Sequence, residues 1–275
     1  MIRSVMNYAY LIVFGYVPYI VVAVFIAGVV FRLVRWLMPK SLTGLYNVNA
    51  TVNDDSYAKI TIEILKRIFL FYTLPGTDTT LFIGSVLFHW GIWIALVGHL
   101  GLLIPPAQLE AMGISPAMHV LLARVVGGLG GVMALIGMLI LISRRLVNRR
   151  VRVGSFIVNL PMRDFSYLDD YFADATLLAI IMLGLAQTLW LEYIEPGFFE
   201  YSVAPWIWSL ASFNVSRAVS YILTAPPITM VHVILAMIFI AYFPWGKMMH
   251  PFSLIYISPT VARPSIKIRV KSVPG

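Results

Sequence analysis

The sequence contains no cysteine, and this absence excludes several kinds of redox and metal site at once. Without thiols the chain cannot form disulfides, thiolate zinc sites, iron–sulfur clusters ligated by its own residues, or the covalent attachment of c-type haem. Any redox cofactor that this chain binds must therefore be held by histidine or methionine.

Charged residues are also scarce, at 12% of the 275 residues, or about half the fraction usual in a soluble domain. Apolar residues make up 60%, and the mean hydropathy is +0.87. A chain this apolar cannot cover a water-facing surface, so the lipid bilayer must be its solvent. The net charge of +8 does not indicate nucleic-acid binding, because the basic residues lie in loops between apolar runs. We predict a multi-pass protein of the cell membrane that binds no nucleic acid.

Five apolar runs are long enough to cross a hydrocarbon core about 30 Å thick, which takes about 20 helical residues. In lipid every backbone amide must be paired within the chain, which forces helices. The first run is too long for the apolar region of a signal peptide and lacks a small-residue cleavage site. The predicted fold class is therefore all-α: a single polytopic membrane domain, residues 1–275, with five transmembrane helices. These cover roughly residues 9–34, 81–104, 118–142, 173–193 and 228–247.

Two of the connections have a composition of their own. The loop at about 35–80 contains the amphipathic segment SYAKITIEILKRIFLF (56–71), which we expect to form a helix along the membrane surface or under a partner. The connection 194–227 is rich in Trp, Tyr and Phe, as residues at a membrane interface are. The apolar face of the amphipathic segment is formed by Ile60, Ile64, Ile68 and Phe71.

The basic residues predict the orientation of the chain. In a five-span topology, seventeen of the twenty Lys and Arg residues fall on one side, and only Arg3 and Arg217 fall on the other. The remaining one, Arg124, lies inside the third run. Because cytoplasmic loops carry the excess of positive charge, we expect the N-terminus outside. The loop at about 35–80 and the basic tail at about 248–275 are then cytoplasmic.

Four of the five histidines lie in two pairs on the second and fifth predicted helices: His89 with His99, and His232 with His250. Ionisable side chains at membrane depth are costly and tend to mark function, and neutral imidazole is a natural axial ligand of haem iron. Since the two helices run in opposite directions, His89 should meet His250 near the cytoplasm, and His99 should meet His232 near the outside. Two bis-histidine haems would then bridge the helices.

The spacings within the two pairs differ, and the difference needs a structural explanation. His89 and His99 are ten residues apart, about 15 Å along a helix, whereas His232 and His250 are eighteen apart, about 27 Å. We expect tilt, together with a break at Pro244, to absorb the mismatch. Gly91, Gly98 and the run GGLGG (127–131) permit close approach, either of a flat macrocycle or of a neighbouring helix.

At these residues the sequence resembles the gamma subunit of membrane-bound respiratory nitrate reductase. The resemblance implies two b-type haems as cofactors, with His99 and His232 as iron ligands of the outer haem and His89 and His250 as those of the inner haem. It also implies oxidation of quinol from the quinone pool near the outer haem, and delivery of electrons to cytoplasmic iron–sulfur and catalytic subunits. The matching stretches are YVPYIVVAVF (16–25), LFHWGIWIALVGHLG (87–101), LIGMLILISRRLVNRRVR (135–152) and VHVILAMIFIAYFPWGKMMH (231–250).

Two features depart from that family and favour its relatives. The connection after the first helix is longer, and the tail carries the motif ISPT (257–260). In both features the sequence resembles the cytochrome b subunits associated with dissimilatory sulfite reductase or with membrane heterodisulfide reductase more closely. Those relatives leave open a reversed electron flow, in which quinone is reduced.

Four further residues are candidates for the sites that the resemblance implies. His119 falls where the nitrate reductase subunit has a lysine near the quinol site, and it could accept a quinol proton; the alternative is an interfacial histidine. Arg144 and Arg145 match the family's basic pair and are candidates to bind haem propionates, or they are ordinary cytoplasmic charge. Arg124 lies within the third span and needs a partner, for which an outer propionate is one candidate.

These observations lead to a functional prediction and leave one rival of another class. We predict the quinol-oxidising electron-transfer subunit of a respiratory oxidoreductase of the nitrate reductase type, which does not act on the terminal acceptor by itself. The sulfite-reductase-associated and heterodisulfide-reductase-like complexes are the alternative. A haem-free transporter or membrane anchor would relay protons through its histidines and should carry acidic partners for them. The second and fifth predicted helices contain no Asp or Glu, which disfavours that rival.

Overall fold

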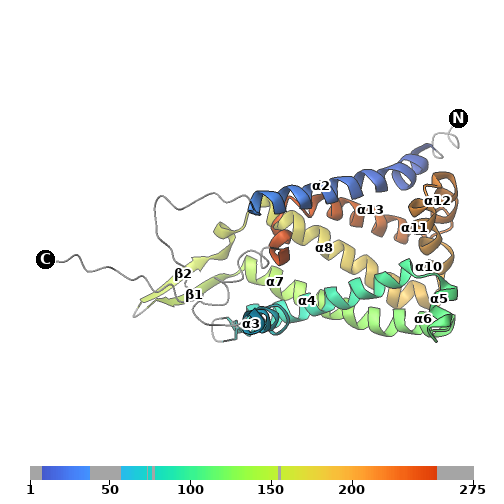
Figure 1. Ribbon diagram of the computed structural model, residues 1–275. Coiled ribbons are helices and arrows are strands. Elements are labelled where there is room, and N and C mark those ends of the chain that lie inside the picture. Colours follow the sequence, from blue (N-terminus) through green and yellow to red (C-terminus); the bar gives the residue numbers. More distant parts are fainter. Residues whose placement is uncertain (1–7, 38–56, 73, 76–77, 154–155, 253–275) are drawn as a thin grey trace.

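The computed structural model describes residues 8–37, 57–72, 74–75, 78–153 and 156–252. Arg3, the ISPT motif and most of the predicted cytoplasmic tail lie outside the described residues. Long helices run side by side along the whole bundle (Figure 1). The elements that form them are η1 (Leu11–Tyr16), α2 (Val17–Leu37), α4 (Thr79–Leu100), α6 (Pro116–Leu122), η4 (Ala123–Gly127), α7 (Gly128–Leu146), α8 (Leu168–Ala186), η6 (Gln187–Leu191), α9 (Glu192–Ile194) and α13 (Pro227–Tyr242).

Four helical stretches in the described part of the chain are long and apolar enough to cross a membrane. The fifth predicted span corresponds to α13, which is apolar but has 16 residues, or about 24 Å of helix. The helix ends at Tyr242, and the chain turns through Pro244 into the short 3₁₀-helix η7 (Lys247–Met249). The break expected at Pro244 is therefore present. The four longer stretches are Tyr8–Arg35, Thr79–Leu103, Pro116–Leu146 and Leu168–Ile194.

The helices pack in an order that differs from their order in the sequence. α4 packs along α7, α7 along α8, α8 along α13, and α13 along α2. A buried cluster between α7 and α8 contains Ala134, Met138, Leu177, Ile181 and Leu185. Many large apolar side chains on the outside of the bundle stay exposed, as lipid-facing residues would be.

Glycines form the contact between α4 and α7. A Cβ atom added at Gly91 would lie 2.3 Å from the backbone nitrogen of Ala134. A Cβ atom added at Gly137 would lie 2.3 Å from the backbone nitrogen of Phe88. An added Cβ at Gly130 would meet Ile94 at 2.8 Å. Small residues let two helix backbones approach closely in a membrane. Of the two possibilities for Gly91, the structure shows helix packing. At Gly98, no atom of the described residues lies within 4 Å of an added Cβ.

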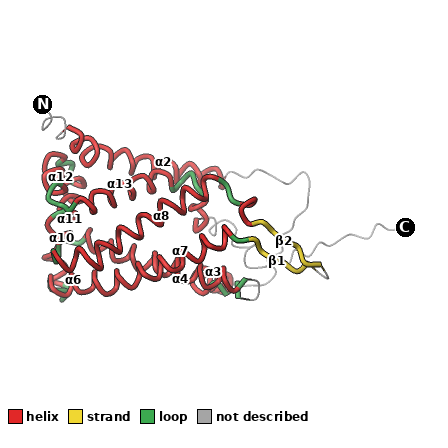
Figure 2. The backbone as a smooth tube through the Cα atoms, turned by 180° about the vertical axis from the view of Figure 1, so that it is seen from behind, coloured by secondary structure: helices red, strands yellow, loops and turns green. Residues whose placement is uncertain are grey.

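Short helices close one end of the bundle, and α3 with a β-hairpin lies at the other (Figures 1 and 2). The aromatic connection folds against the start of the first helix: the buried Trp206 donates to the carbonyl of Phe14 at 2.9 Å, and Tyr19 donates to that of Leu210 at 2.7 Å. The short elements at this end are η3 (Gly101–Leu103), α5 (Pro106–Ala111), α10 (Phe198–Tyr201), α11 (Val203–Ala211) and α12 (Val215–Ile222).

The predicted amphipathic helix is α3 (Tyr57–Leu70), which appears nearly end-on in both views and so lies across the bundle axis. It reaches α4 through Phe69, whose carbonyl accepts from Trp90 Nε1 at 3.0 Å.

The prediction of an all-α chain missed one feature. β1 (Asn148–Val153) and β2 (Phe156–Pro161) form an antiparallel hairpin in which Val151 pairs with Val158, followed by the 3₁₀-helix η5 (Met162–Phe165). The hairpin projects beyond the helices (Figure 1), where water can satisfy its edges. Strand structure is excluded only inside the lipid core, so this segment is free to form it.

Candidate functional site

The four helix-borne histidines come together as the sequence pairing expects. The imidazole rings of His99 and His232 have centroids 6.4 Å apart and lie nearly parallel, at 14°. Those of His89 and His250 have centroids 5.9 Å apart and are nearly perpendicular, at 84°. Each pair joins α4 to α13 or to the turn that follows it. Their role as iron ligands remains a proposal.

The turn after α13 explains how unequal spacings give two matching pairs. His89 and His99 are ten residues apart on α4, and ten residues of α13 lead from His232 to its last residue, Tyr242. Both segments therefore rise about 15 Å. The next eight residues form a turn and one 3₁₀ turn instead of continuing the helix. Helical rise stops at Tyr242, which places His250 opposite His89.

Backbone carbonyls fix the orientation of three of the four rings. The Nδ1 atom of His89 lies 2.8 Å from the carbonyl oxygen of Ser85. The Nδ1 atom of His99 lies 2.7 Å from the carbonyl oxygen of Ala95. His250 makes the same kind of contact with Lys247, at 3.1 Å. An Nδ1–H that donates to a carbonyl leaves the Nε2 lone pair available for a metal. The Nδ1 atom of His232 is buried and has no hydrogen-bond partner of ordinary geometry among the described residues.

The spacing of the rings in each pair would allow the two imidazoles to hold one haem iron between them. Bonds of about 2.0–2.1 Å from metal to imidazole nitrogen place two opposite nitrogens about 4 Å apart and the ring centres about 6 Å apart. The observed centroid distances of 6.4 and 5.9 Å agree with that value. Within the described residues, no group of three or more His, Cys, Asp or Glu side chains could hold a metal ion alone. Each pair would supply two imidazoles, and a macrocycle would supply the other ligands of a metal held there.

His119 lies at the closed end of the bundle, close to the His99 pair. Its Nδ1 atom is 2.9 Å from Oε1 of Glu200, and its ring packs edge-on against Phe199 at a centroid distance of 5.2 Å. The Nε2 atom faces Gly101, where an added Cβ would be 3.1 Å away. Gly101 is two residues beyond His99, so this imidazole lies beside the end of α4 that carries His99.

Arg124 lies nearby, inside the π-helical turn η4. It donates to the carbonyl of Glu192 at 2.6 Å and lies over the ring of Tyr193 at 5.8 Å. The carboxylate of Glu192, which is 2% exposed, accepts from the backbone N–H of Gly197 at 2.7 Å. The Nε atom of Arg124 is buried and has no acceptor among the described residues. A buried guanidinium donor without an acceptor leaves room for an acidic group such as a propionate.

Arg144 and Arg145 contact protein carboxylates at the opposite end. Arg144 donates to Oδ2 of Asp78 from Nε at 3.1 Å and from Nη2 at 2.8 Å. Arg145 lies 2.9 Å from Asp174 and 3.7 Å from Asp170. Both arginines therefore tie α7 to neighbouring segments, and a haem propionate would share these guanidinium groups with existing partners.

Comparison with known proteins identifies the family of a chain with this geometry. The family model described as nitrate reductase gamma subunit matches residues 76–270. The chain belongs to the nitrate reductase gamma subunit family. The match begins after α3, so the first helix and the long connection lie outside it.

Three relatives show the range of this gamma subunit family. The chain is 26% identical to the nitrate reductase gamma chain of Bacillus subtilis over 88% of its own length and 91% of the relative. It is also 26% identical to the Hdr-like menaquinol oxidoreductase cytochrome b-like subunit of Archaeoglobus fulgidus, over 92% and 80% of the two chains. The respiratory nitrate reductase 2 gamma chain of Escherichia coli is 29% identical over 62% and 70%. Nitrate reductase chains and an Hdr-like subunit are thus similar to this protein to about the same degree.

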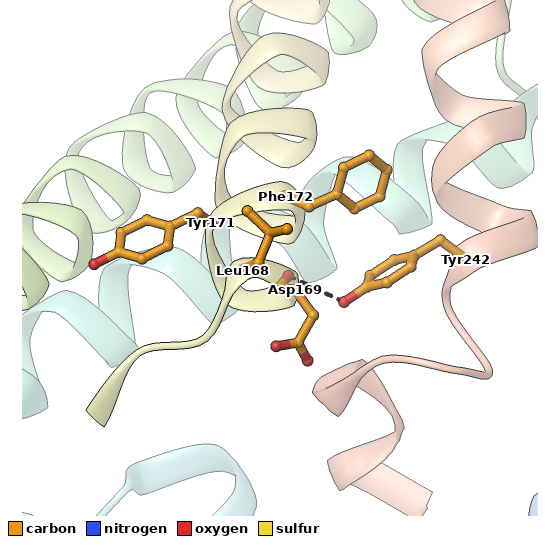
Figure 3. Close-up of a pocket in the computed structure, with 5 residues that line it drawn as sticks. All are labelled: Leu168, Asp169, Tyr171, Phe172 and Tyr242. Atoms are coloured by element: carbon orange, nitrogen blue, oxygen red, sulfur yellow. Dashed lines mark hydrogen bonds between the residues drawn. The ribbon is translucent and has the colours of Figure 1, made fainter. Parts of the chain in front are cut away.

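The end of the bundle that carries the hairpin also has an open apolar depression, between the start of α8 and the end of α13. It is lined by Leu168, Asp169, Tyr171, Phe172 and Tyr242 (Figure 3). Tyr242 closes one side by donating to the carbonyl of Asp169 at 3.1 Å. Because the depression is wide open, it does not suit a tightly held ligand.

Proposed function

We propose that this chain is a di-haem cytochrome b subunit that oxidises quinol near its closed end and serves a cytoplasmic iron–sulfur and catalytic subunit. The observation that carries the proposal is the juxtaposition of two imidazole pairs, at centroid distances of 6.4 and 5.9 Å, between α4 and α13. When bound there, two b haems would supply a path for electrons across the membrane. The family membership and the cytochrome b-like relative support this reading.

The protein's own contribution is to hold the ligand rings before any cofactor arrives. The carbonyls of Ser85 and Ala95 orient His89 and His99 within one helix, and the turn after Pro244 brings His250 opposite His89. Such outer contacts fix the tautomer and increase the basicity of a ligand imidazole. Close packing of α4 on α7 through Gly91 keeps the two α4 ligands on a rigid helix.

The proton chemistry of quinol oxidation is assigned to His119. Its Nδ1–H donates to Glu200, so the Nε2 lone pair is the basic site. Quinol bound against that nitrogen would lose one of its two protons to it and the other to water at the closed end. A haem held by His99 and His232 would supply the acceptor for the electrons that quinol gives up. Glu200 is partly exposed, at 25% of its side chain, and its negative charge would stabilise the imidazolium until the proton reaches water.

We infer five spans, with the short helices and His119 outside and the hairpin inside. The excess of Lys and Arg in the loops on the hairpin side supports this orientation. The turn and 3₁₀ segment after α13 would complete the fifth crossing. Protons would then be released outside while electrons move inward, and each charge moved against 100 mV conserves about 2.3 kcal/mol.

An Hdr-like complex is the second candidate for the partner of this subunit. The observation that favours it is the similarity to the Archaeoglobus subunit, which covers 92% of this chain. The two candidates predict the same haem sites and differ in the cytoplasmic partner and in the direction of electron flow. Purification of the intact complex from its native membrane would separate them by the cofactors of the associated subunits.

Haem content tests the proposed function directly. We expect the purified chain to carry two non-covalent b haems, measured as the pyridine haemochrome per protein and seen as low-spin signals. A preparation that folds in detergent but binds one haem or none after reconstitution would contradict the di-haem assignment.

A further inference from the structure

The turn that carries His250 is anchored on one side by α2. Pro244 is fully buried, and its ring packs so closely on Gly28 that an added Cβ there would be 2.6 Å away. Trp245 packs against Phe31 at a ring-centroid distance of 6.3 Å. These contacts are apolar and fix where the chain leaves α13.

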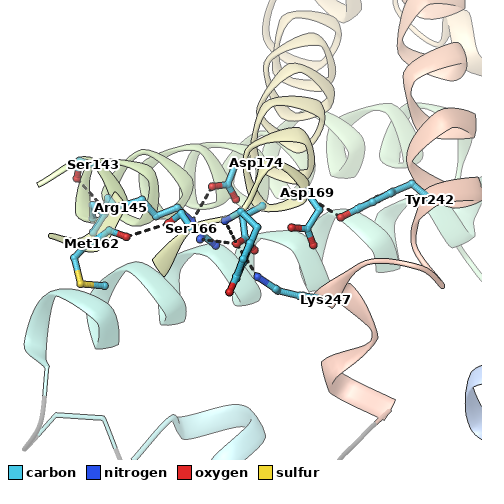
Figure 4. Close-up of polar contacts among 11 residues, drawn as sticks. Ser143, Arg145, Met162, Ser166, Asp169, Asp174, Tyr242 and Lys247 are labelled. Atoms are coloured by element: carbon cyan, nitrogen blue, oxygen red, sulfur yellow. Dashed lines mark hydrogen bonds and ion pairs between the residues drawn. The ribbon is translucent and has the colours of Figure 1, made fainter. Parts of the chain in front are cut away.

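The other side of the turn is held by the start of α8 through polar contacts (Figure 4). Lys247 donates from Nζ to Oδ2 of Asp170 at 2.7 Å, and its ammonium lies 4.8 Å from the ring centre of Tyr167. Asp170 is 6% exposed, whereas the Lys247 side chain is 56% exposed. The same carboxylate accepts from the backbone N–H of Tyr167 at 3.0 Å and lies 3.7 Å from Arg145. A buried carboxylate needs such partners, and these contacts hold the Asp170 side chain in one position.

Lys247 connects Asp170 to His250. Its ammonium binds Asp170, and its backbone carbonyl lies 3.1 Å from Nδ1 of His250. The residue that orients the imidazole is therefore itself tethered to α8. We propose that the Asp170–Lys247 ion pair is a positioning device that aims the His250 imidazole at the inner haem site. This inference rests on the proposed function, because it requires His250 to be an axial ligand.

The other three histidines do not depend on such a tether. His89 and His99 donate to carbonyls four residues earlier in the same helix, so helix geometry alone orients them. His232 is also on a regular helix. His250 follows a 3₁₀ turn after a break, where the backbone has fewer internal hydrogen bonds to hold it. An external contact at Lys247 therefore has a larger effect on His250 than it would have within α13.

Two substitutions distinguish an effect on the position of the His250 imidazole from an effect on the local charge. Asp170→Asn and Lys247→Met both break the ion pair, but the first makes the site more positive and the second makes it less positive. A charge effect alone would move the potential of the inner haem in opposite directions in the two variants. Loss of positioning would weaken inner haem binding in both, by about 10-fold or more, as losses of outer-shell partners do.

The experiment uses the full-length chain reconstituted with haem. It measures retention of each haem by spectral titration, the spin state by EPR, and both midpoint potentials. The outer haem serves as an internal reference, and Asp164→Asn and Lys66→Met are matched controls because both residues are exposed and make the same charge changes. Asp170→Glu keeps the carboxylate and should recover much of the inner haem binding.

The inference predicts weakened or high-spin inner haem in both Asp170→Asn and Lys247→Met, with the outer haem and both controls unchanged. Wild-type inner haem binding in both variants, with potentials shifted in opposite directions, would overturn it. If Asp170→Asn does not assemble, Lys247→Met decides, because that side chain is more than half exposed. A wild-type chain that binds no haem would refute the proposed function before this inference is reached.

Discussion

The Nδ1 atom of His119 lies 2.9 Å from Oε1 of Glu200, although the two residues are 81 positions apart. The carboxylate selects the tautomer in which Nε2 is unprotonated, the form that a general base needs. Tyr201 follows Glu200 in the chain and donates a hydrogen bond to Glu195. Desolvation and a hydrogen bond to Glu195 raise the pKa of Tyr201 to about 12, so the phenol stays a neutral donor throughout the physiological range.

Replacement of His119 by leucine should slow quinol-driven haem reduction by about 10²-fold or more, the usual scale for loss of a general base. Both haems should stay bound with nearly unchanged spectra, because the axial ligands are untouched. The measurement is stopped-flow reduction by a menaquinol analogue. Unchanged rates would return His119 to the role of an interfacial histidine.

The pH profile of the same reaction tests the pairing with Glu200. Wild-type rates should rise with pH, because a protonated imidazole cannot accept a quinol proton. Glu200→Leu should remove the stabilising charge and the tautomer preference, giving a rate between those of wild type and His119→Leu. A profile and rate identical to wild type in Glu200→Leu would contradict the dyad.

The contact of α4 with α7 should be intolerant of added volume at Gly91. Alanine there would place its Cβ 2.3 Å from the nitrogen of Ala134, and overpacking of this kind costs about 1–3 kcal/mol or more. Gly127→Ala is the matched control, because its Cβ would meet Thr188 at an ordinary 3.7 Å. Thermal unfolding in detergent should show a clear loss of stability in the first variant alone, and equal stability would argue against close packing.

Reporter fusions should place a reporter after Gly275 in the cytoplasm and one inserted near Pro196 outside. The reason is the excess of Lys and Arg in the loops on one side of the bundle. A reversed pattern would put His119 on the cytoplasmic face and contradict proton release to the outside.

The sequence predicted which segments form helices more accurately than it predicted the residues at which those helices begin. The third and fourth spans begin at Pro116 and Leu168, earlier than hydropathy indicates, because a polar cap precedes the third span and acidic residues occupy the first turn of the fourth. Ser115 caps the first of these by accepting from the N–H of Met118, and Asp169 and Asp170 occupy the first turn of α8. Acidic groups are favourable at a helix N-terminus, so a hydropathy limit placed after them cuts the helix short.

The histidine pairing was accessible from sequence, whereas the contacts around it were not. Antiparallel helices, a fixed rise per residue and the expected break at Pro244 were enough to pair the histidines. Glu200, Asp78 and Asp170 lie 66 to 81 residues from the basic groups that they meet. Only the folded chain brings them together. The hairpin was missed because its strands lie in a short basic loop that resembled an ordinary cytoplasmic connection.

The most direct test of this account is to replace each of the four paired histidines with alanine and follow the two haems separately by redox-resolved spectra. We expect His99→Ala and His232→Ala to lose one haem, and His89→Ala and His250→Ala to lose the other, as the centroid distances of 6.4 and 5.9 Å indicate. Loss of the same haem from His99→Ala and His250→Ala, or retention of both haems in all four variants, would contradict the account.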